Sequence, residues 1–235
     1  MSSLQGKKIL VADDEPMLRE IIRDVLEFEG AQVREAANGK EALALIQADP
    51  VQAVVSDIRM PGGDGLELLE NLRKADFATP VVLLITGFSD LSHDSAYQKG
   101  ADAVLSKPFD VNELIDRIQF LLKGLKDRLA SPPSKASRAE IGDASVTGVA
   151  LGRSGMFVQG YADSSVGDQV GVDLGCELES RLNGAAVVRW VRKTVQGELP
   201  PGSGLEFVYL KDASLKQFED HVKHHPTRAS IPDRS

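Results

Sequence analysis

The sequence predicts an α/β domain with a parallel sheet, followed by a smaller all-β domain. In residues 7–129, short and continuously apolar runs rich in Val, Ile and Leu alternate with segments of helical periodicity. This pattern is typical of buried parallel strands joined by helices. Beyond residues 130–138, which are rich in proline and small polar residues, the apolar runs are shorter and are separated by Gly, Asp and Ser. Such spacing indicates a small barrel or sandwich.

The first domain is expected to contain five strands that alternate with five helices. The strands are expected at 7–12, 31–36, 52–57, 80–86 and 101–105, and the helices near 15–29, 39–48, 64–75, 90–99 and 110–129. The first helix has an apolar stripe at helical spacing, formed by Leu18, Ile21, Ile22, Val25 and Leu26. Asp110 is suited to cap the start of the last helix. Because each helix returns the chain to a parallel strand, right-handed crossovers are expected.

The second domain is expected to be built from short strands and one terminal helix. Apolar runs lie at 145–151, 155–158, 169–174, 184–191 and 204–210, and a helix is expected from Ser214 to about His224. The predicted organisation is therefore a first domain at 1–129, a linker at 130–138, a second domain at 139–224 and a disordered polar tail at 225–235.

Charge, apolar content and cysteine count argue against a nucleic-acid-binding, membrane-spanning or secreted protein. The net charge is −8, and most of the acidic excess lies in residues 1–129, with 22 Asp and Glu against 15 Lys and Arg. We expect no nucleic-acid binding, because the first half is acidic, the second has no basic stripe, and no helix-turn-helix pattern follows the linker. No apolar run approaches the ~20 residues of a membrane helix, and no secretory leader is evident. With Cys176 as the only cysteine, a cytoplasmic protein is expected.

Polar residues close four of the predicted strands. Asp13 and Asp14 follow the first strand, Asp57 ends the third, Thr86 ends the fourth and Lys107 follows the fifth. The carboxyl ends of parallel strands meet at one edge of a sheet. A carboxylate there can attack phosphorus and hold the group as an acyl phosphate, with Mg²⁺ neutralising oxygen charge. We expect Asp57 as nucleophile, the three carboxylates as metal ligands, and Lys107 and Thr86 as phosphoryl contacts.

Residues 7–129 resemble the receiver domain of bacterial response regulators. The resemblance rests on Val11–Glu15, Asp57–Gly65, Thr86–Gly87 and Lys107–Phe109. It implies a flavodoxin-like sheet with strand order 2-1-3-4-5, and a role as a non-enzymatic signalling protein phosphorylated on Asp57 by a histidine kinase. It also implies that Arg59 contributes its backbone carbonyl to the metal. Val104 stands where receivers commonly place a switching aromatic residue, so phosphorylation is expected to act with a smaller rearrangement or mainly through dimerisation.

Residues 134–224 resemble a PilZ domain, a small β-barrel that in many proteins binds cyclic di-GMP. The resemblance rests on the segments 149–158, 166–170, 186–191 and 204–208. The family grips its ligand with an Arg-x-x-x-Arg segment and an Asp/Asn-x-Ser-x-x-Gly turn, since arginines can hold phosphates through two hydrogen bonds and stack on guanines.

Both parts of that grip are degenerate in this sequence. Ala150 and Gly152 replace the acid and the serine of the turn, and only Arg138 remains before the barrel. The weak candidate ligand residues are Arg138, Asp143, Ser145 and Arg153. Cyclic di-GMP binding is therefore not expected, although a true cyclic di-GMP receptor that integrates phosphorylation with second-messenger binding is the alternative hypothesis.

The leading hypothesis is a response regulator whose divergent PilZ-like domain contacts an unknown downstream protein or supports dimerisation. A homodimer is one expected form, because a stripe with heptad-like spacing runs towards the linker. It consists of Ile115, Ile118, Leu122, Leu125 and Leu129. Packing of the same stripe against the sheet is an equal alternative.

Overall fold

The chain divides into two compact units, Met1–Lys123 and Gly124–Ser235, each with its own hydrophobic core. The computed structural model describes residues 4–75, 80–87, 96–97, 99–130, 139–143, 146–152, 155–176, 178, 181–195 and 200–224. Most of the helix predicted at 90–99, residues 131–138 of the predicted linker and the tail at 225–235 lie outside the described residues. None of the helices in the described part of the chain has both the length and the hydrophobicity that a membrane crossing requires.

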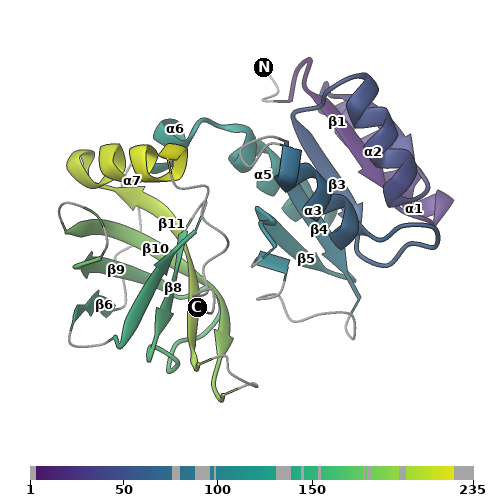
Figure 1. The fold of residues 1–235 in the computed structure, drawn as a ribbon. Coiled ribbons are helices and arrows are strands. Elements are labelled where there is room, and N and C mark those ends of the chain that lie inside the picture. The colour runs from purple at the N-terminus through teal and green to yellow at the C-terminus, as the bar shows by residue number, and fades with distance from the viewer. Residues whose placement is uncertain are drawn as a thin grey trace. The chain divides into compact units, whose positions relative to one another are not determined.

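The first unit is a five-stranded parallel sheet in the order β2-β1-β3-β4-β5 (Figure 1). Its strands are β1 (Lys8–Ala12), β2 (Gln32–Ala36), β3 (Ala53–Asp57), β4 (Val81–Thr86) and β5 (Ala103–Ser106). All their pairings are parallel. The predicted flavodoxin-like order is confirmed, and each strand overlaps its predicted range. The continuous apolar runs have this form because helices cover both faces of the sheet, so both sets of side chains are buried.

Two separate apolar layers lie on the two faces of this sheet. The helices are α1 (Pro16–Phe28), α2 (Gly39–Ala48), α3 (Gly65–Ala75) and α5 (Val111–Leu122). Helices α2 and α3 pack with one set of strand residues, and α1 and α5 pack with the other set, as the ribbon also shows (Figure 1). Alternate residues of β1 separate accordingly, with Leu10 in the first layer and Ile9 and Val11 in the second.

The last predicted helix of the first domain is interrupted, and this moves the domain boundary. Helix α5 ends at Leu122, and a short helix α6 (Leu125–Leu129) begins after Gly124. Leu129 is buried in the core of the second unit, whereas Ile118 is buried in that of the first. The boundary therefore lies at Lys123 and not at residue 129. The apolar stripe predicted for self-association is thus divided between two cores, which removes its continuity.

The second unit is built on one six-stranded sheet in the order β6-β9-β10-β11-β8-β7. Its elements are β6 (Ala139–Gly142), β7 (Gly148–Leu151), β8 (Gly155–Gln159), β9 (Gln169–Leu174), β10 (Leu182–Arg192), β11 (Gly202–Leu210) and α7 (Asp212–His224). Leu215 and Phe218 of α7 join the core of this unit, and α7 lies across one end of the sheet in Figure 1. The predicted all-β character and terminal helix are confirmed, and β6 is an additional strand that the sequence did not predict.

An aromatic stack lies on the other face of the central strands of this sheet. The rings of Phe157 and Trp190 lie 5.4 Å apart and nearly parallel, and the Arg192 guanidinium lies over both, at 5.6 Å and 5.4 Å from their centroids. Gly204 lies beneath the indole, where a Cβ atom would overlap the ring. The all-β unit therefore has two packed faces, which explains why its strands bury residues of both alternations.

Arg73 and Asp102 form a buried ion pair in the first unit. Arg73 Nη2 lies 2.9 Å from Asp102 Oδ2, and the two side chains are 6% and 3% exposed. Arg73 also donates to the Gly100 and Pro80 carbonyls, and Asp102 accepts a hydrogen bond from the Val82 N–H. The pair thus joins α3 to the amino ends of β4 and β5, opposite the edge to which the polar strand ends point.

Replacing Arg73 with Met should destabilise the chain by about 3–5 kcal/mol, because it leaves a buried carboxylate without its partner. Lys8→Met is the matched control. It removes the Lys8–Asp49 pair, whose side chains are 40% and 44% exposed, and should cost about 1 kcal/mol or less. Urea unfolding followed by far-ultraviolet circular dichroism measures both. Equal effects of the two substitutions would show that burial does not decide the strength of these pairs.

Candidate functional site

The loop after β1 carries a buried carboxylate. Asp13 is 1% exposed, and its N–H donates to the Ala36 carbonyl of β2 at 3.2 Å, which extends the strand pairing into the loop. Asp13 Oδ1 accepts a hydrogen bond from the Glu15 N–H at 2.8 Å. The chain enters α1 directly afterwards, with Pro16 at its first turn, a favoured position for proline. The loop therefore holds the carboxylate at the carboxyl edge of the sheet.

Asp57 is the last residue of β3 and reaches the same edge. It is 6% exposed, and its Oδ2 accepts a hydrogen bond from the Arg59 N–H at 2.7 Å. The chain returns close to the end of β3 at Gly65, whose N–H donates to the Ile58 carbonyl. A Cβ atom at Gly65 would overlap the Asp57 carbonyl oxygen. Only glycine therefore allows α3 to begin so close to the backbone at the end of β3.

Lys107 joins the two buried carboxylates. It follows β5, and its N–H donates to the Thr86 carbonyl at 2.7 Å. The Lys107–Pro108 peptide bond is cis. The Lys107 ammonium lies 2.7 Å from Asp57 Oδ1 and 3.4 Å from Asp13 Oδ2, and it also lies 3.3 Å from Glu15 Oε1. One ammonium group thus contacts carboxylates from three positions of the chain.

The electrostatics of this group follow from burial and charge. Burial raises the pKa of the Asp13 carboxyl group, and the nearby Asp57 charge adds to the effect; the Glu15 N–H and Lys107 oppose it without cancelling it. Burial alone would lower the pKa of Lys107, but its hydrogen bond to Asp57 and the charges of Asp57 and Asp13 raise it above its ordinary value. Lys107 is therefore a permanent cation at neutral pH, suited to hold phosphoryl oxygens.

Three other positions that the sequence singled out in the first domain have different surroundings. Thr86 is 3% exposed, and its hydroxyl donates to the Gly87 carbonyl at 3.0 Å. Asp14 is exposed. Val104 is partly buried against the core, so the position of the missing aromatic residue is filled by a small apolar side chain.

Asp13 and Asp57 fit a Mg²⁺ site, since this ion commonly takes one or two carboxylates and keeps several waters. Both are buried and share the Lys107 ammonium, a cation already held between them. Within the part of the chain that the structure describes, no three or more His, Cys, Asp or Glu side chains are grouped closely enough to form a metal site on their own. Asp14 and the Arg59 carbonyl therefore remain predicted ligands.

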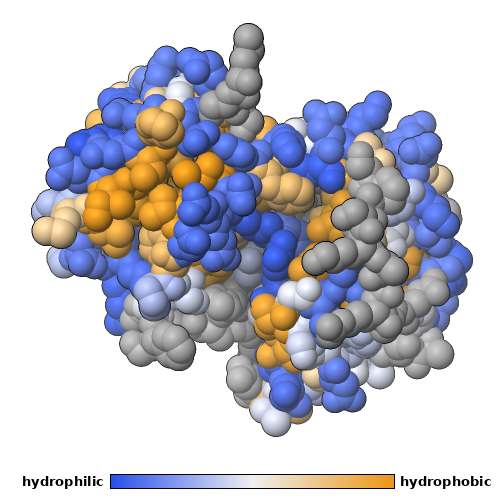
Figure 2. Space-filling view, turned by 180° about the vertical axis from the view of Figure 1, so that it is seen from behind, coloured by the Kyte–Doolittle hydropathy of each residue, from blue (hydrophilic) through white to orange (hydrophobic). Residues whose placement is uncertain are grey.

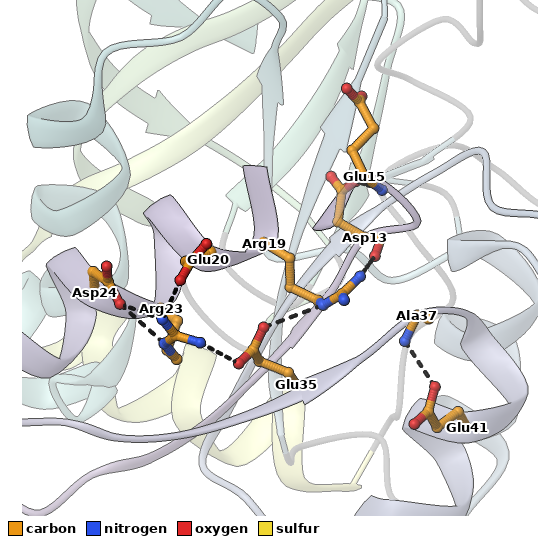
Figure 3. A network of polar contacts seen from close by, with 9 residues as sticks. All are labelled: Asp13, Glu15, Arg19, Glu20, Arg23, Asp24, Glu35, Ala37 and Glu41. Carbon is orange, nitrogen blue, oxygen red and sulfur yellow. Dashed lines mark hydrogen bonds and ion pairs between the residues drawn. The ribbon is translucent and has the colours of Figure 1, made fainter. Parts of the chain in front are cut away.

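Two contacts of the site were not predicted from the sequence. Glu15 contacts Lys107, although it was read only as part of a motif. Arg19 of α1 donates from Nη1 to the Asp13 carbonyl at 2.6 Å, as Figure 3 shows. The signal available for Arg19 was its place on α1, about one turn after residues 13–15, the acid loop between β1 and α1. Spacing alone does not distinguish such an arginine from one that lies in solvent.

Only Asp143 among the candidate cyclic di-GMP residues of the second unit belongs to the described residues. Arg138, Ser145 and Arg153 lie outside them. Asp143 is described, and its carboxylate is engaged: Arg181 Nη1 lies 2.8 Å from Oδ2, and the Gly175 N–H donates to Oδ1 at 2.8 Å. The hydrogen bond from Arg181 lowers the pKa of Asp143, and the Gly175 N–H contributes. This carboxylate is therefore held by its own chain.

The first unit matches a known family along most of its length. Residues 9–119 match the model of the response regulator receiver domain. Residues 9–119 form a response regulator receiver domain. The predicted recognition of a receiver is thus confirmed, whereas the PilZ-like assignment of the second unit stays a prediction.

Curated relatives agree with this assignment. The transcriptional regulatory protein TrcR of Mycobacterium tuberculosis is 34% identical over 141 residues, which cover 60% of this chain and 54% of that protein. The response regulator MprA of Mycolicibacterium vanbaalenii is 40% identical over 116 residues, which cover 49% and 50% of the two chains. The chain thus spans about half the length of these relatives. Among solved structures, a Francisella response regulator receiver domain is 34% identical, with coverage of 50% and 97% and a TM-score of 0.47.

Asp13→Asn should stabilise the receiver domain at neutral pH by about 1 kcal/mol, a size typical of stabilising substitutions. The raised pKa of Asp13 means that folding disfavours its charged form. The side chain is protonated in both states below the unfolded pKa of about 3.9, so the variant should gain nothing there. Its advantage should grow as the pH rises through the folded pKa. Thermal unfolding between pH 4 and pH 8 measures this, and a variant less stable than the wild type at pH 8 would contradict it.

Proposed function

We propose that this protein is a two-component response regulator that accepts a phosphoryl group on Asp57 from a histidine kinase, in the cytoplasm and with Mg²⁺. The observation that carries the proposal is the convergence of Asp57, Asp13 and Lys107 at the carboxyl edge of the receiver sheet. The protein acts as an acceptor and switch and is not itself proposed to be an enzyme.

The residues suit an in-line transfer. An Asp57 carboxylate oxygen forms a bond to phosphorus as the bond from phosphorus to the donor nitrogen breaks, and the donor imidazole takes up the proton that its nitrogen then needs. Bound Mg²⁺ would neutralise charge on the phosphoryl oxygens. Lys107 would exchange its contact with Asp57 for one with the phosphoryl group, and the Thr86 hydroxyl would turn from the Gly87 carbonyl to the same group.

The surface of the receiver supports a protein donor. Met17 and Ile21 of α1 are 77% and 46% exposed, and Phe28 at its end is 90% exposed. Figure 2 shows hydrophobic residues gathered over this side of the first unit. An exposed apolar patch commonly marks a protein contact. Met17 is two residues from Glu15, so a partner bound there would lie next to the acid loop.

We propose that the second unit is a divergent PilZ-like domain that acts through protein contact or dimerisation. The engagement of Asp143 by Arg181 and the loss of the acid and serine at Ala150 and Gly152 support this over a cyclic di-GMP receptor. TrcR is named a transcriptional regulator, but about half of that protein has no counterpart in the match. The near-neutral, strand-rich second half of this chain supports an output other than nucleic-acid binding.

Acetyl phosphate with Mg²⁺ should phosphorylate the wild type, and Asp57→Asn should abolish the modification, because an amide is not a nucleophile for this transfer. Electrophoresis that retards phosphoproteins measures the result. Asp64→Asn is the matched control in the same loop. The Asp64 carboxylate caps α3 through the Glu67 N–H, a bond that the Asn oxygen can keep. Undiminished labelling of Asp57→Asn would overturn the assignment.

Calorimetric titration of cyclic di-GMP into the full chain should detect no binding tighter than about 10 μM, a threshold within the micromolar class of affinities. Each lost charge-assisted hydrogen bond typically costs roughly 1.5–3 kcal/mol of binding free energy. The sequence lacks one arginine, the acid and the serine that make such contacts in the family. If the wild type binds more tightly than this and the Arg138→Ala variant binds more weakly than the wild type, the receptor hypothesis is favoured instead.

A further inference from the structure

The Asp13 backbone carbonyl has an unusual partner. β1 ends at Ala12 and α1 begins at Pro16, so this carbonyl lies between two regular elements. Asp13 itself is almost fully buried, and a buried carbonyl without a hydrogen bond is destabilising. Arg19 reaches back from α1 and donates to it at 2.6 Å. A charged donor therefore holds the backbone of the residue that supplies a buried acid of the site.

Arg19 is itself held in place by the neighbouring strand. Its Nε lies 3.2 Å from Glu35 Oε1 of β2, and the side chains are 17% and 29% exposed. Glu35 also binds Arg23 one turn further along α1, with 2.8 Å between Oε2 and Nη1. Figure 3 shows the resulting chain of contacts from Asp13 through Arg19 and Glu35 to Arg23. The guanidinium is thus fixed at two ends, one on β2 and one on the acid loop.

We infer that Arg19 is a positioning residue that fixes the Asp13 carboxylate for Mg²⁺ binding and phosphoryl transfer. The inference rests on the proposed function. Arg19 contacts the Asp13 carbonyl and not the carboxylate, so it acts by fixing the peptide to which the carboxylate belongs. The N–H of the same residue is fixed by Ala36 and one carboxylate oxygen by the Glu15 N–H, so Arg19 completes the restraint.

Arg23 provides the control for this inference. It has the same charge, lies on the same helix and shares Glu35, but its side chain pairs with Glu35, Asp24 and Glu20 instead of reaching the Asp13 carbonyl. Electrostatics alone predict that loss of either arginine would strengthen the binding of a cation nearby. A positioning role predicts the opposite, namely weaker cation binding, and predicts it only for the loss of Arg19.

The test compares Mg²⁺ binding by wild type, Arg19→Gln and Arg23→Gln in calorimetric titrations of the full chain. A Gln side chain is too short to span the distance from α1 to the Asp13 carbonyl. Arg19→Gln should raise the Kd by at least about tenfold, the usual lower effect of removing a residue that orients a metal ligand. Arg23→Gln should leave it within about twofold, as is usual for a surface substitution.

Two further measurements separate positioning from a general loss of structure. Thermal unfolding should show that both Gln variants remain folded at the temperature of the titration, although Arg19→Gln loses more stability because it leaves the Asp13 carbonyl without its donor. Arg19→Lys, which can still reach one of the two partners of Arg19, should recover part of the Mg²⁺ affinity. The initial rate of acetyl phosphate labelling at subsaturating Mg²⁺ should follow the same order.

Each outcome bears on a definite claim. An unchanged or lower Kd for Arg19→Gln, or an equal rise for Arg23→Gln, overturns the positioning role while leaving the proposed function intact. Absence of Mg²⁺ binding and labelling in the wild type overturns the proposed function, and the positioning role with it. A raised Kd confined to Arg19→Gln and partly recovered by Arg19→Lys supports both.

Discussion

The Lys107 ammonium group is the cation on which the polar edge of the receiver sheet depends. Three carboxylates contact it, and two of them, on Asp13 and Asp57, are almost fully buried. Like charges this close are unfavourable unless a cation lies between them. Three carboxylates and one ammonium leave two negative charges, which one divalent cation can neutralise. The same group that stabilises the edge therefore leaves it ready for Mg²⁺ and for the oxygens of a phosphoryl group.

The parallel sheet brings these charged groups together at one place. Parallel strands bring residues that are far apart in sequence to a single edge, and the strand-end hydrogen bonds extend that order into the loops, as between Lys107 and Thr86. The buried Arg73–Asp102 pair secures the opposite end of the strands. Stability at one end and unsatisfied charge at the other are typical of a sheet that positions a reactive site.

The sequence predicted the receiver sheet well because its central strands, β1, β3 and β4, are buried on both faces. The polar residues at the strand ends followed from that pattern, whereas the order of the strands followed from the resemblance. The prediction of one continuous helix at 110–129 was wrong at the end of α5. The spacing of apolar residues identifies the apolar face of a helix, but it does not identify the core against which that face packs. Leu129 keeps the helical spacing of Ile118 but packs in the other unit.

Other features escaped prediction for different physical reasons. β6 (Ala139–Gly142) is a short edge strand with little apolar content, and edge strands need few buried side chains. The contacts of Glu15 and Arg19 depend on how a loop turns between β1 and α1. Asp143 was a candidate ligand residue in the sequence, but in the fold its carboxylate is engaged by Arg181. A residue type at a given spacing does not reveal which partner its side chain meets.

Direct identification of the phosphorylated residue tests the central claim most closely, because Asp13 and Asp57 share the same ammonium group. The wild-type chain, treated with acetyl phosphate and Mg²⁺, can be reduced with borohydride, which converts a phosphorylated aspartate to homoserine, and then mapped by peptide mass spectrometry. The account predicts homoserine at position 57 and at no other carboxylate. Homoserine at position 13, or at neither position, would contradict it.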